Sequence, residues 1–292
     1  MDLQQLRYFV AVAELANFSR AAARCGVAQP SLSQQIQKLE RELGQPLLDR
    51  LPRGAMLTEA GTRLLDRARR ILSEADAAVR EVHEARDAVA GRLSVGAIPT
   101  IAPFLLPPVI RRFIRDHRRV ELELHEHVTD RLLEQVTAGT IDLAVASLPL
   151  EHRLLHVEPL FTEPLVLALP ADHRLAARKT VSWDAIAEER YLVLHEMHCL
   201  SGQSMGFCRS HGSEPNVIMR GEQLGTLLDM VALGLGISIV PQMLAAADRS
   251  TRRVYRPLRG NEPHRTVVVA WHLDRYRTNA SRAFAQALHV QS

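Results

Sequence analysis

The stretch of residues 20–40, RAAARCGVAQPSLSQQIQKLE, constrains the fold of this chain more than any other. It predicts two short helices joined by a tight turn. The first is expected over residues 19–25, with Ser19 as its N-cap and Gly26 supplying the positive φ that ends a helix. The second is expected to begin near Pro30, because a proline at the first helical position lacks an N–H that would have no partner there anyway.

The second predicted helix has one apolar face and one polar face. Its apolar residues recur at spacings of four, three and four, which predicts a buried stripe of Leu32, Ile36, Leu39 and Leu43. Amides, hydroxyls and a cation on the other face are suited to meeting base edges and phosphates in a DNA major groove. The candidate DNA-contacting residues here are Gln29, Pro30, Ser31, Ser33, Gln34, Gln37 and Lys38. An ordinary solvent-exposed helix face is the alternative interpretation.

Flanking segments complete a small N-terminal domain. An earlier helix is predicted by the spacing of Leu3, Leu6, Phe9, Val10 and Ala13, and Phe18 and Cys25 are expected in the same core. After the helix pair, two extended pieces near residues 47–50 and 55–58 predict a hairpin wing. Arg50 and Arg53 lie near its tip, where they are candidates to reach phosphates or a minor groove. Singly exposed arginines are the alternative.

One long helix is predicted over residues 58–90. Its apolar and small positions alternate at spacings of four and three for more than four heptads, with charges elsewhere. A seam this long cannot be hidden in a small domain, so we expect the helix to pair with a copy of itself. Packing against its own domain is the competing interpretation. The seam consists of Leu57, Gly61, Leu64, Ala68, Ile71, Ala75, Ala78, Val82, Ala85 and Val89.

From Arg92 onward, predicted strands alternate with helices. This order predicts parallel sheets covered on both faces, and about 200 residues of it exceed one compact sheet, so two α/β lobes with a cleft are expected. Strands are predicted near 93–98, 120–127, 141–147, 163–170, 191–194, 237–240 and 266–271, and helices near 103–113, 130–138, 223–232 and 280–290.

Composition excludes several classes of protein. Three cysteines in 292 residues do not make a secreted disulfide scaffold. The N-terminus lacks an apolar signal core, and the uncharged run 230–247 is broken by Gly234, Gly236 and Pro241, so no membrane span is predicted. We therefore expect a cytoplasmic protein. Residues 1–58 carry seven Lys or Arg and five Asp or Glu, so DNA contacts must come from placement rather than bulk charge.

Several motifs together resemble the LysR-type transcriptional regulators. They are LRYFVAVAE, AQPSLSQQIQKLE, LLDR and LTEAG, followed by the long helix and two lobes. The resemblance implies a winged helix-turn-helix over 1–58, a dimerisation helix over 59–90 and a regulatory domain over 91–292. Lobe I would comprise 92–163 plus 267–292 and lobe II 164–266, with crossings near Glu163 and Thr266. It also implies promoter DNA, RNA polymerase and a homodimer or homotetramer as partners, no cofactor and no enzymatic activity. Leu48 departs from the usual phenylalanine.

The segment HCLSGQSMGFC, from His198 to Cys208, resembles the peroxide-sensing subgroup of this family. IPTIAPFLLPP (98–108) and PHRTVVVAW (263–271) resemble it too. The resemblance implies that Cys199 is the peroxide-reactive thiol and Cys208 the resolving thiol. It implies that the polar residues around the reactive sulfur are Thr100, Thr129, His198 and Arg265.

The residues around the two cysteines suit a reaction of a thiol with peroxide. A thiolate attacks peroxide, so positive charge or helix N–H groups that lower the thiol pKa would favour the reaction, and we expect His198 and Arg265 to supply the charge. A sulfenic acid forms and a second thiol captures it as a disulfide.

The spacing of the two cysteines has a mechanical consequence. If the segment is helical, nine residues separate the thiols by about 13 Å, whereas a disulfide needs Cα atoms within about 7 Å. The segment must therefore unwind, which Gly202 and Gly206 would ease.

Alternatives follow from the same residues. Two cysteines nine residues apart are often simply small core residues, and a zinc site would have only His198 and the two thiols as candidates. Met197 and Ser201-Gly202 depart from the subgroup's pattern. A regulator that binds a small anionic metabolite between the lobes, through Thr100, Thr129 and Arg265, is the second hypothesis. A thiol peroxidase or a solute-binding protein would not explain the polar helix or the long seam.

Overall fold

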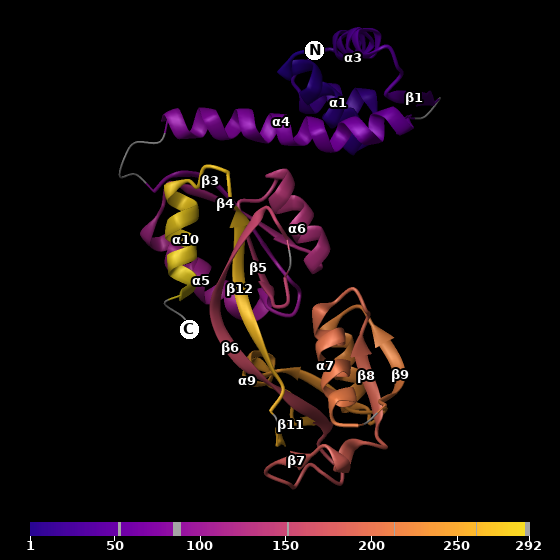
Figure 1. The fold of residues 1–292 in the computed structure, drawn as a ribbon, viewed down its shortest axis with the longest axis vertical. Coiled ribbons are helices and arrows are strands. Elements are labelled where there is room, and N and C mark those ends of the chain that lie inside the picture. Colours follow the sequence, from indigo (N-terminus) through magenta and orange to yellow (C-terminus); the bar gives the residue numbers. More distant parts are fainter. Residues whose placement is uncertain (52–53, 84–88, 151, 213, 261, 290–292) are drawn as a thin grey trace. The chain divides into compact units, whose positions relative to one another are not determined.

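The computed structural model describes residues 1–292 except 52–53, 84–88, 151, 213, 261 and 290–292. The chain divides into two compact units, of which the first contains residues 1–85. Its described residues form three shorter helices, a hairpin and one long helix, which Figure 1 labels in part. Their bounds are α1 Leu3–Leu15, α2 Phe18–Arg24, α3 Gln29–Leu43, β1 Leu48–Leu51, β2 Gly54–Leu57 and α4 Glu59–His83. The winged helix-turn-helix expected from the sequence is present.

The core of this unit forms where the apolar spacing places it. Leu32, Ile36 and Leu39 of α3 are fully buried and pack with Leu6 and Phe9 of α1. The fourth stripe residue is an exception: Leu43 is 42% exposed. It is the last residue of α3, and Gly44 then takes a left-handed conformation that turns the chain away from the core.

The start of α2 also differs from the prediction. The N-cap is Asn17 rather than Ser19, and the Asn17 side chain accepts a hydrogen bond from the Arg20 amide at 3.0 Å. Asparagine caps helices as well as serine does, and the helix therefore begins two residues earlier than a cap at Ser19 would allow. The helix itself and the turn after it lie as predicted.

The long helix α4 begins against the wing. The Thr58 hydroxyl accepts a hydrogen bond from the Gly61 amide at 3.0 Å, and a Cβ on Gly61 would lie 2.0 Å from the Leu47 carbonyl oxygen. A glycine is therefore required where the helix meets the hairpin. Farther along, Ala68 is fully buried, whereas Ile71 and Val82 are 39% and 82% exposed.

The far end of α4 differs from the expected end at residue 90. Among the described residues the helix ends at His83, and residues 89–90 are not helical. Val89 packs against a core of the second unit, so its assignment to the helical seam is wrong. Ala85 lies outside the described residues.

The second unit is built on a mixed sheet. In its described residues the strand order is β4-β3-β5-β12-β6-β11-β7, with β10 also paired to β6, and β8 and β9 form a separate pair. The strands are β3 Gly91–Ala97, β4 Val120–Glu126, β5 Leu143–Ser147, β6 Leu155–Pro170, β7 Val181–Ser182, β8 Arg190–Leu194, β9 Asn216–Gly221, β10 Ser238–Pro241, β11 Arg253–Arg259 and β12 His264–His272. The helices are α5 Ala102–Asp116, α6 Thr129–Ala138, α7 Cys199–Ser210, α8 Leu224–Ala232, α9 Gln242–Ala247 and α10 Asn279–His289, with a 3-10 turn η1 at Asp184–Ile186.

Two separate hydrophobic cores define the lobes. The core of lobe I includes Leu93, Phe113 and Phe284, and the core of lobe II includes Leu167, Tyr191 and Val231. The long strands β6 and β12 lie side by side and connect the lobes (Figure 1), with Glu163 opposite Arg265. The domain boundaries proposed from the sequence stay a prediction.

The expectation of purely parallel sheets is wrong in part. The pairs β3–β4, β3–β5 and β8–β9 are parallel, but β12 runs antiparallel to β5 and β6, and β10 and β11 run antiparallel to β6. The cause is β6, a 16-residue strand shared by both lobes. In each lobe the chain later comes back beside β6 in the opposite direction, as β10 and β11 in lobe II and as β12 between the lobes.

Candidate redox site and DNA-contacting face

Both sensor cysteines lie on the single helix α7, which runs from Cys199 to Ser210. Cys208 is fully buried in the core of lobe II, whereas Cys199 is partly buried and packs against the core of lobe I. The rise of an α-helix places residues nine apart about 13 Å from one another. Both thiols are free, so the structure is that of the reduced form.

Opposing effects act on the Cys199 thiol. Burial raises its pKa above the ordinary value, while the Arg265 guanidinium, the Thr129 hydroxyl and backbone N–H groups at the start of α7 act in the opposite direction. Burial has the largest effect. Arg265 and the backbone N–H groups therefore act on the pKa in the expected sense, but burial outweighs them.

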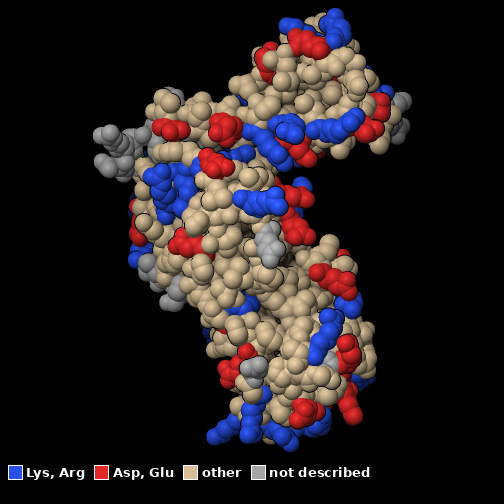
Figure 2. All heavy atoms as spheres, viewed as in Figure 1, with Lys and Arg blue, Asp and Glu red and all other residues tan. Residues whose placement is uncertain are grey.

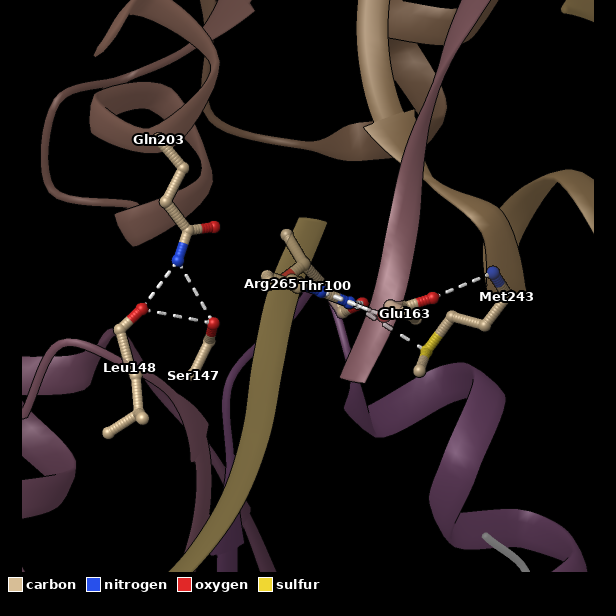
Figure 3. Close-up of polar contacts among 7 residues, drawn as sticks. All are labelled: Thr100, Ser147, Leu148, Glu163, Gln203, Met243 and Arg265. Atoms are coloured by element: carbon tan, nitrogen blue, oxygen red, sulfur yellow. Dashed lines mark hydrogen bonds and ion pairs between the residues drawn. The ribbon is translucent and has the colours of Figure 1, made fainter. Parts of the chain in front are cut away.

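Arg265 is the most completely bonded residue near this sulfur. Its Nε donates to Glu163 Oε1 at 2.8 Å, and its Nη1 and Nη2 donate to the Thr100 hydroxyl and carbonyl at 2.9 and 3.0 Å. The other Glu163 oxygen accepts from the Met243 amide at 3.0 Å, at the start of α9 (Figure 3). The hydrogen bonds of Arg265, Glu163, Thr100 and Met243 connect the two lobes, at the place where the paired strands β6 and β12 pass from one lobe to the other.

His198 stands at the N-cap of α7 and is 8% exposed. Burial is the main cause that lowers the pKa of its imidazole below the ordinary value. The ring is therefore neutral near pH 7, and the expectation that His198 supplies positive charge to Cys199 is wrong. A neutral imidazole can still accept or donate a hydrogen bond.

The two threonines lie in different hydrogen-bonding situations. The Thr100 hydroxyl is occupied by Arg265. The buried Thr129 hydroxyl favours the Cys199 thiolate but completes no hydrogen bond with the described residues. A buried hydroxyl without a complete hydrogen bond leaves donor and acceptor capacity for a small polar guest beside the sulfur.

Cys208 lies beside Tyr191, a residue that the sequence motifs did not single out. Burial raises the pKa of Cys208, and a hydrogen bond with Tyr191 partly offsets this. The Tyr191 hydroxyl donates to the Ile186 carbonyl at 3.0 Å, and burial raises the pKa of the phenol. The thiol is therefore neutral and enclosed while α7 is intact.

Gln203 is a second residue that no sequence motif singles out. It lies between the two cysteines on α7, and its side-chain nitrogen donates to Ser147 Oγ at 3.0 Å and to the Leu148 carbonyl at 2.6 Å (Figure 3). Ser147 ends β5 of lobe I. The contact therefore connects the centre of α7 to lobe I.

The candidate DNA-contacting face of the first unit is solvent-accessible. Ser33 is partly buried, and the other candidates on α3 are exposed: Gln29, Pro30, Ser31, Gln34, Gln37 and Lys38. Arg50 on the wing donates to Ser33 Oγ at 2.8 Å, and its guanidinium lies 4.8 Å from the centre of the Phe18 ring. Arg53 lies outside the described residues. Acidic and basic side chains are mixed over the visible face of this unit (Figure 2), in keeping with its small basic excess.

Two sequence families each match one part of the chain, and together they cover almost all of it. Residues 3–62 match the bacterial regulatory helix-turn-helix proteins of the lysR family, and residues 86–291 match the LysR substrate binding domain. The chain belongs to the LysR family of bacterial transcriptional regulators.

Among its relatives are the OxyR proteins. The DNA-binding transcriptional dual regulator OxyR of Escherichia coli K12 is 39% identical over 93% of this chain and 89% of its own length. A full-length cysteine-to-aspartate OxyR from Pseudomonas aeruginosa superimposes with a TM-score of 0.83 at 31% identity, covering 99% of this chain and 95% of that one. A hydrogen-peroxide-bound cysteine-to-serine OxyR from Corynebacterium glutamicum has a TM-score of 0.66 at 30% identity, covering 99% and 93%.

The described residues contain neither a membrane-spanning helix nor a group of side chains that could hold a metal ion. None of the helices there combines the length and the apolar character needed to cross a bilayer. Within the same residues, no cluster of three or more His, Cys, Asp or Glu side chains could hold a metal ion.

Proposed function

We propose that this protein is a cytoplasmic, DNA-binding transcription activator that responds to hydrogen peroxide through reversible formation of a Cys199–Cys208 disulfide. The observation that carries the proposal is the placement of two free thiols near the ends of one helix. One thiol is partly exposed beside Arg265 and Thr129, and the other is enclosed in a core. Relatives named as hydrogen peroxide-inducible gene activators support it.

The reaction consumes two thiols and one peroxide. The Cys199 thiolate attacks one peroxide oxygen, so that an S–O bond forms, the O–O bond breaks and hydroxide leaves, taking a proton to become water. The Cys208 thiol then gives up its proton and its sulfur attacks the sulfenic sulfur, so that an S–S bond forms, the S–O bond breaks and the leaving hydroxide takes up the proton as a second water. The two sulfurs are oxidised and both peroxide oxygens are reduced.

The geometry makes the second step a conformational switch. Cα atoms about 13 Å apart on a helix must approach to within about 7 Å, so α7 unwinds and Cys208 leaves the core. Local refolding of this kind can change how subunits contact one another and how DNA-binding domains are spaced. Promoter DNA, a homodimer or homotetramer and RNA polymerase are the partners this proposal requires.

A regulator that binds an anionic metabolite between the lobes is the weaker alternative. It would need Arg265 to bind a carboxylate, but the guanidinium is already paired with the Glu163 carboxylate and also donates to Thr100, so the metabolite would have to compete with Glu163. A thermal shift that depends on such a metabolite and survives Cys199→Ser would favour it.

The proposal is tested by treating the reduced protein with one equivalent of peroxide and mapping thiols by mass spectrometry. We expect a 199–208 disulfide, with Cys25 remaining free. Footprints of the promoter with reduced and oxidised protein should differ in extent. Absence of that disulfide, or identical footprints, would contradict the proposal.

A further inference from the structure

Helix α7 contacts both lobes, through apolar packing against lobe II and through hydrogen bonds to lobe I. Toward lobe II it buries Leu200, Met205 and Cys208 in an apolar core. Toward lobe I it presents Cys199, and Gln203 makes two hydrogen bonds there, to Ser147 and Leu148. The second attachment is polar and depends on one side-chain amide.

The orientation of that amide is fixed by its partners. The Leu148 carbonyl can only accept a hydrogen bond, so the atom facing it at 2.6 Å must be the Gln203 nitrogen. The Gln203 oxygen is buried and has no partner among the described residues. Both hydrogen bonds therefore use one –NH2 group, which a carboxylate of the same size would lack.

The acceptors lie where the lobes join. Ser147 is opposite Val267 in the β5–β12 pair, and the Leu148 amide donates to the Thr266 carbonyl at 3.0 Å. Thr266 follows Arg265, which is bonded to Thr100 and Glu163. The Gln203 contact thus ends next to the cluster that bonds to both lobes.

Gln203 is also centrally placed in the segment that must move. It is four residues after Cys199 and five before Cys208, at the middle of the segment whose helix must be disrupted before the two cysteines can be bridged. The helical, reduced form is the one in which Gln203 reaches Ser147 and Leu148.

We infer that Gln203 sets the reduction potential of the sensor by stabilising the reduced form through Ser147 and Leu148, an inference that rests on the proposed disulfide. Loss of the contact removes an interaction that the oxidised form does not make. The oxidation equilibrium constant should then rise, and the protein should respond to less peroxide.

The test is a redox titration of the full-length protein in glutathione buffers. For Gln203→Leu we expect an oxidation constant larger by about tenfold, which corresponds to a potential about 30 mV more negative. Ser147→Ala should shift it in the same direction by less, and the double variant should shift it no more than Gln203→Leu alone. Ser210→Ala, which removes a bond within the helix end but no contact to lobe I, should leave the potential unchanged.

Gln203→Glu keeps the size of the side chain and removes the donor, so it should reproduce the shift if Gln203→Leu fails to fold. An unchanged potential in the folded variant, or strictly additive shifts in the double variant, would overturn the inference. Failure of the unaltered protein to form the disulfide would instead overturn the proposed function on which the inference rests.

Discussion

Arg265 and Glu163 form an ion pair at 2.8 Å across the two strands that connect the lobes, with side chains 0% and 8% exposed. Their hydrogen bonds extend to Thr100 on one side and to the Met243 amide on the other. A charge pair this deeply enclosed is stabilising only while both members and their hydrogen bonds are present. The cluster is therefore a point where small changes in geometry affect both lobes and the environment of Cys199.

Removing Glu163 should strongly destabilise the regulatory unit. In Glu163→Ala the Arg265 cation stays buried without its counter-ion, and we expect the free energy of unfolding to fall by about 3–5 kcal/mol. Urea denaturation of the reduced protein measures this. Glu158, on the same strand, pairs with His289 at a half-exposed site, so Glu158→Ala should cost no more than about 1 kcal/mol. Equal effects of the two changes would contradict the prediction.

The rate of peroxide oxidation should depend steeply on pH. Burial holds the pKa of the Cys199 thiol above its ordinary value, so the thiol form dominates at neutral pH and the reactive thiolate is a minor species. In that regime the thiolate fraction, and hence the rate constant, should rise about tenfold per pH unit between pH 6 and 8. Acid quenching and thiol alkylation at each pH measure the rate. A flat profile would show that the thiolate already predominates.

The free capacity of the Thr129 hydroxyl should matter for the first chemical step. Thr129→Val keeps the shape but removes a hydroxyl that favours the Cys199 thiolate and makes no other hydrogen bond with the described residues, so we expect oxidation about tenfold slower, as for loss of one hydrogen bond. Thr129→Ser retains the hydroxyl and should stay close to the unaltered rate. The same trapping assay applies, and equal rates for both variants would remove Thr129 from the site.

Two substitutions should separate positioning from base reading on DNA. Arg50→Ala should weaken binding to operator and unrelated DNA alike and reduce the slope of log affinity against log salt by about 0.9, as for one lost phosphate contact. Gln34→Ala should weaken operator binding by about 1–3 kcal/mol and leave binding to unrelated DNA unchanged. Fluorescence anisotropy over a range of salt concentrations measures both. A salt slope unaffected by Arg50→Ala would place that arginine away from the phosphates.

The apolar residues exposed along α4 should be covered by a second copy of the chain. Ile71→Glu introduces a charge into the proposed seam, and we expect a shift to lower mass in analytical ultracentrifugation. Arg70→Glu changes charge at the adjacent exposed position and should leave the mass unchanged. A mass that is the same for both variants would mean that the helix does not mediate self-association.

Periodicity predicted the parts of the fold in which one element buries one face. The stripe Leu32, Ile36 and Leu39 and the alternating strands and helices of the second unit are confirmed. What periodicity could not show is strand direction, because an apolar run such as 163–170 reads the same in parallel and antiparallel sheets. The predicted N-cap at Ser19 is wrong for a similar reason, because asparagine and serine both cap helices well and the sequence alone does not favour Ser19 over Asn17.

The candidate site, too, could be predicted only in part from the sequence. The cysteines and their polar neighbours were selected through short motifs, but Gln203 and Ser147 are 56 residues apart and Arg265 and Glu163 are 102 apart. Contacts at such separations depend on the tertiary fold and leave no local signal in one sequence. The neutral state of His198 was also hidden, because its burial depends on the packing around α7.

The complete enclosure of Cys208 beside Tyr191 has a consequence for the lifetime of the signal. When the thiol is drawn out, its place in the lobe II core is left to be filled by neighbours shaped for a different packing, and voids of that kind loosen a protein interior. We expect the oxidised form to lose this packing around the Cys208 site. When a thiol reductant breaks the bridge, return of Cys208 to the lobe II core restores those contacts, so recovery of the helix should follow reduction directly.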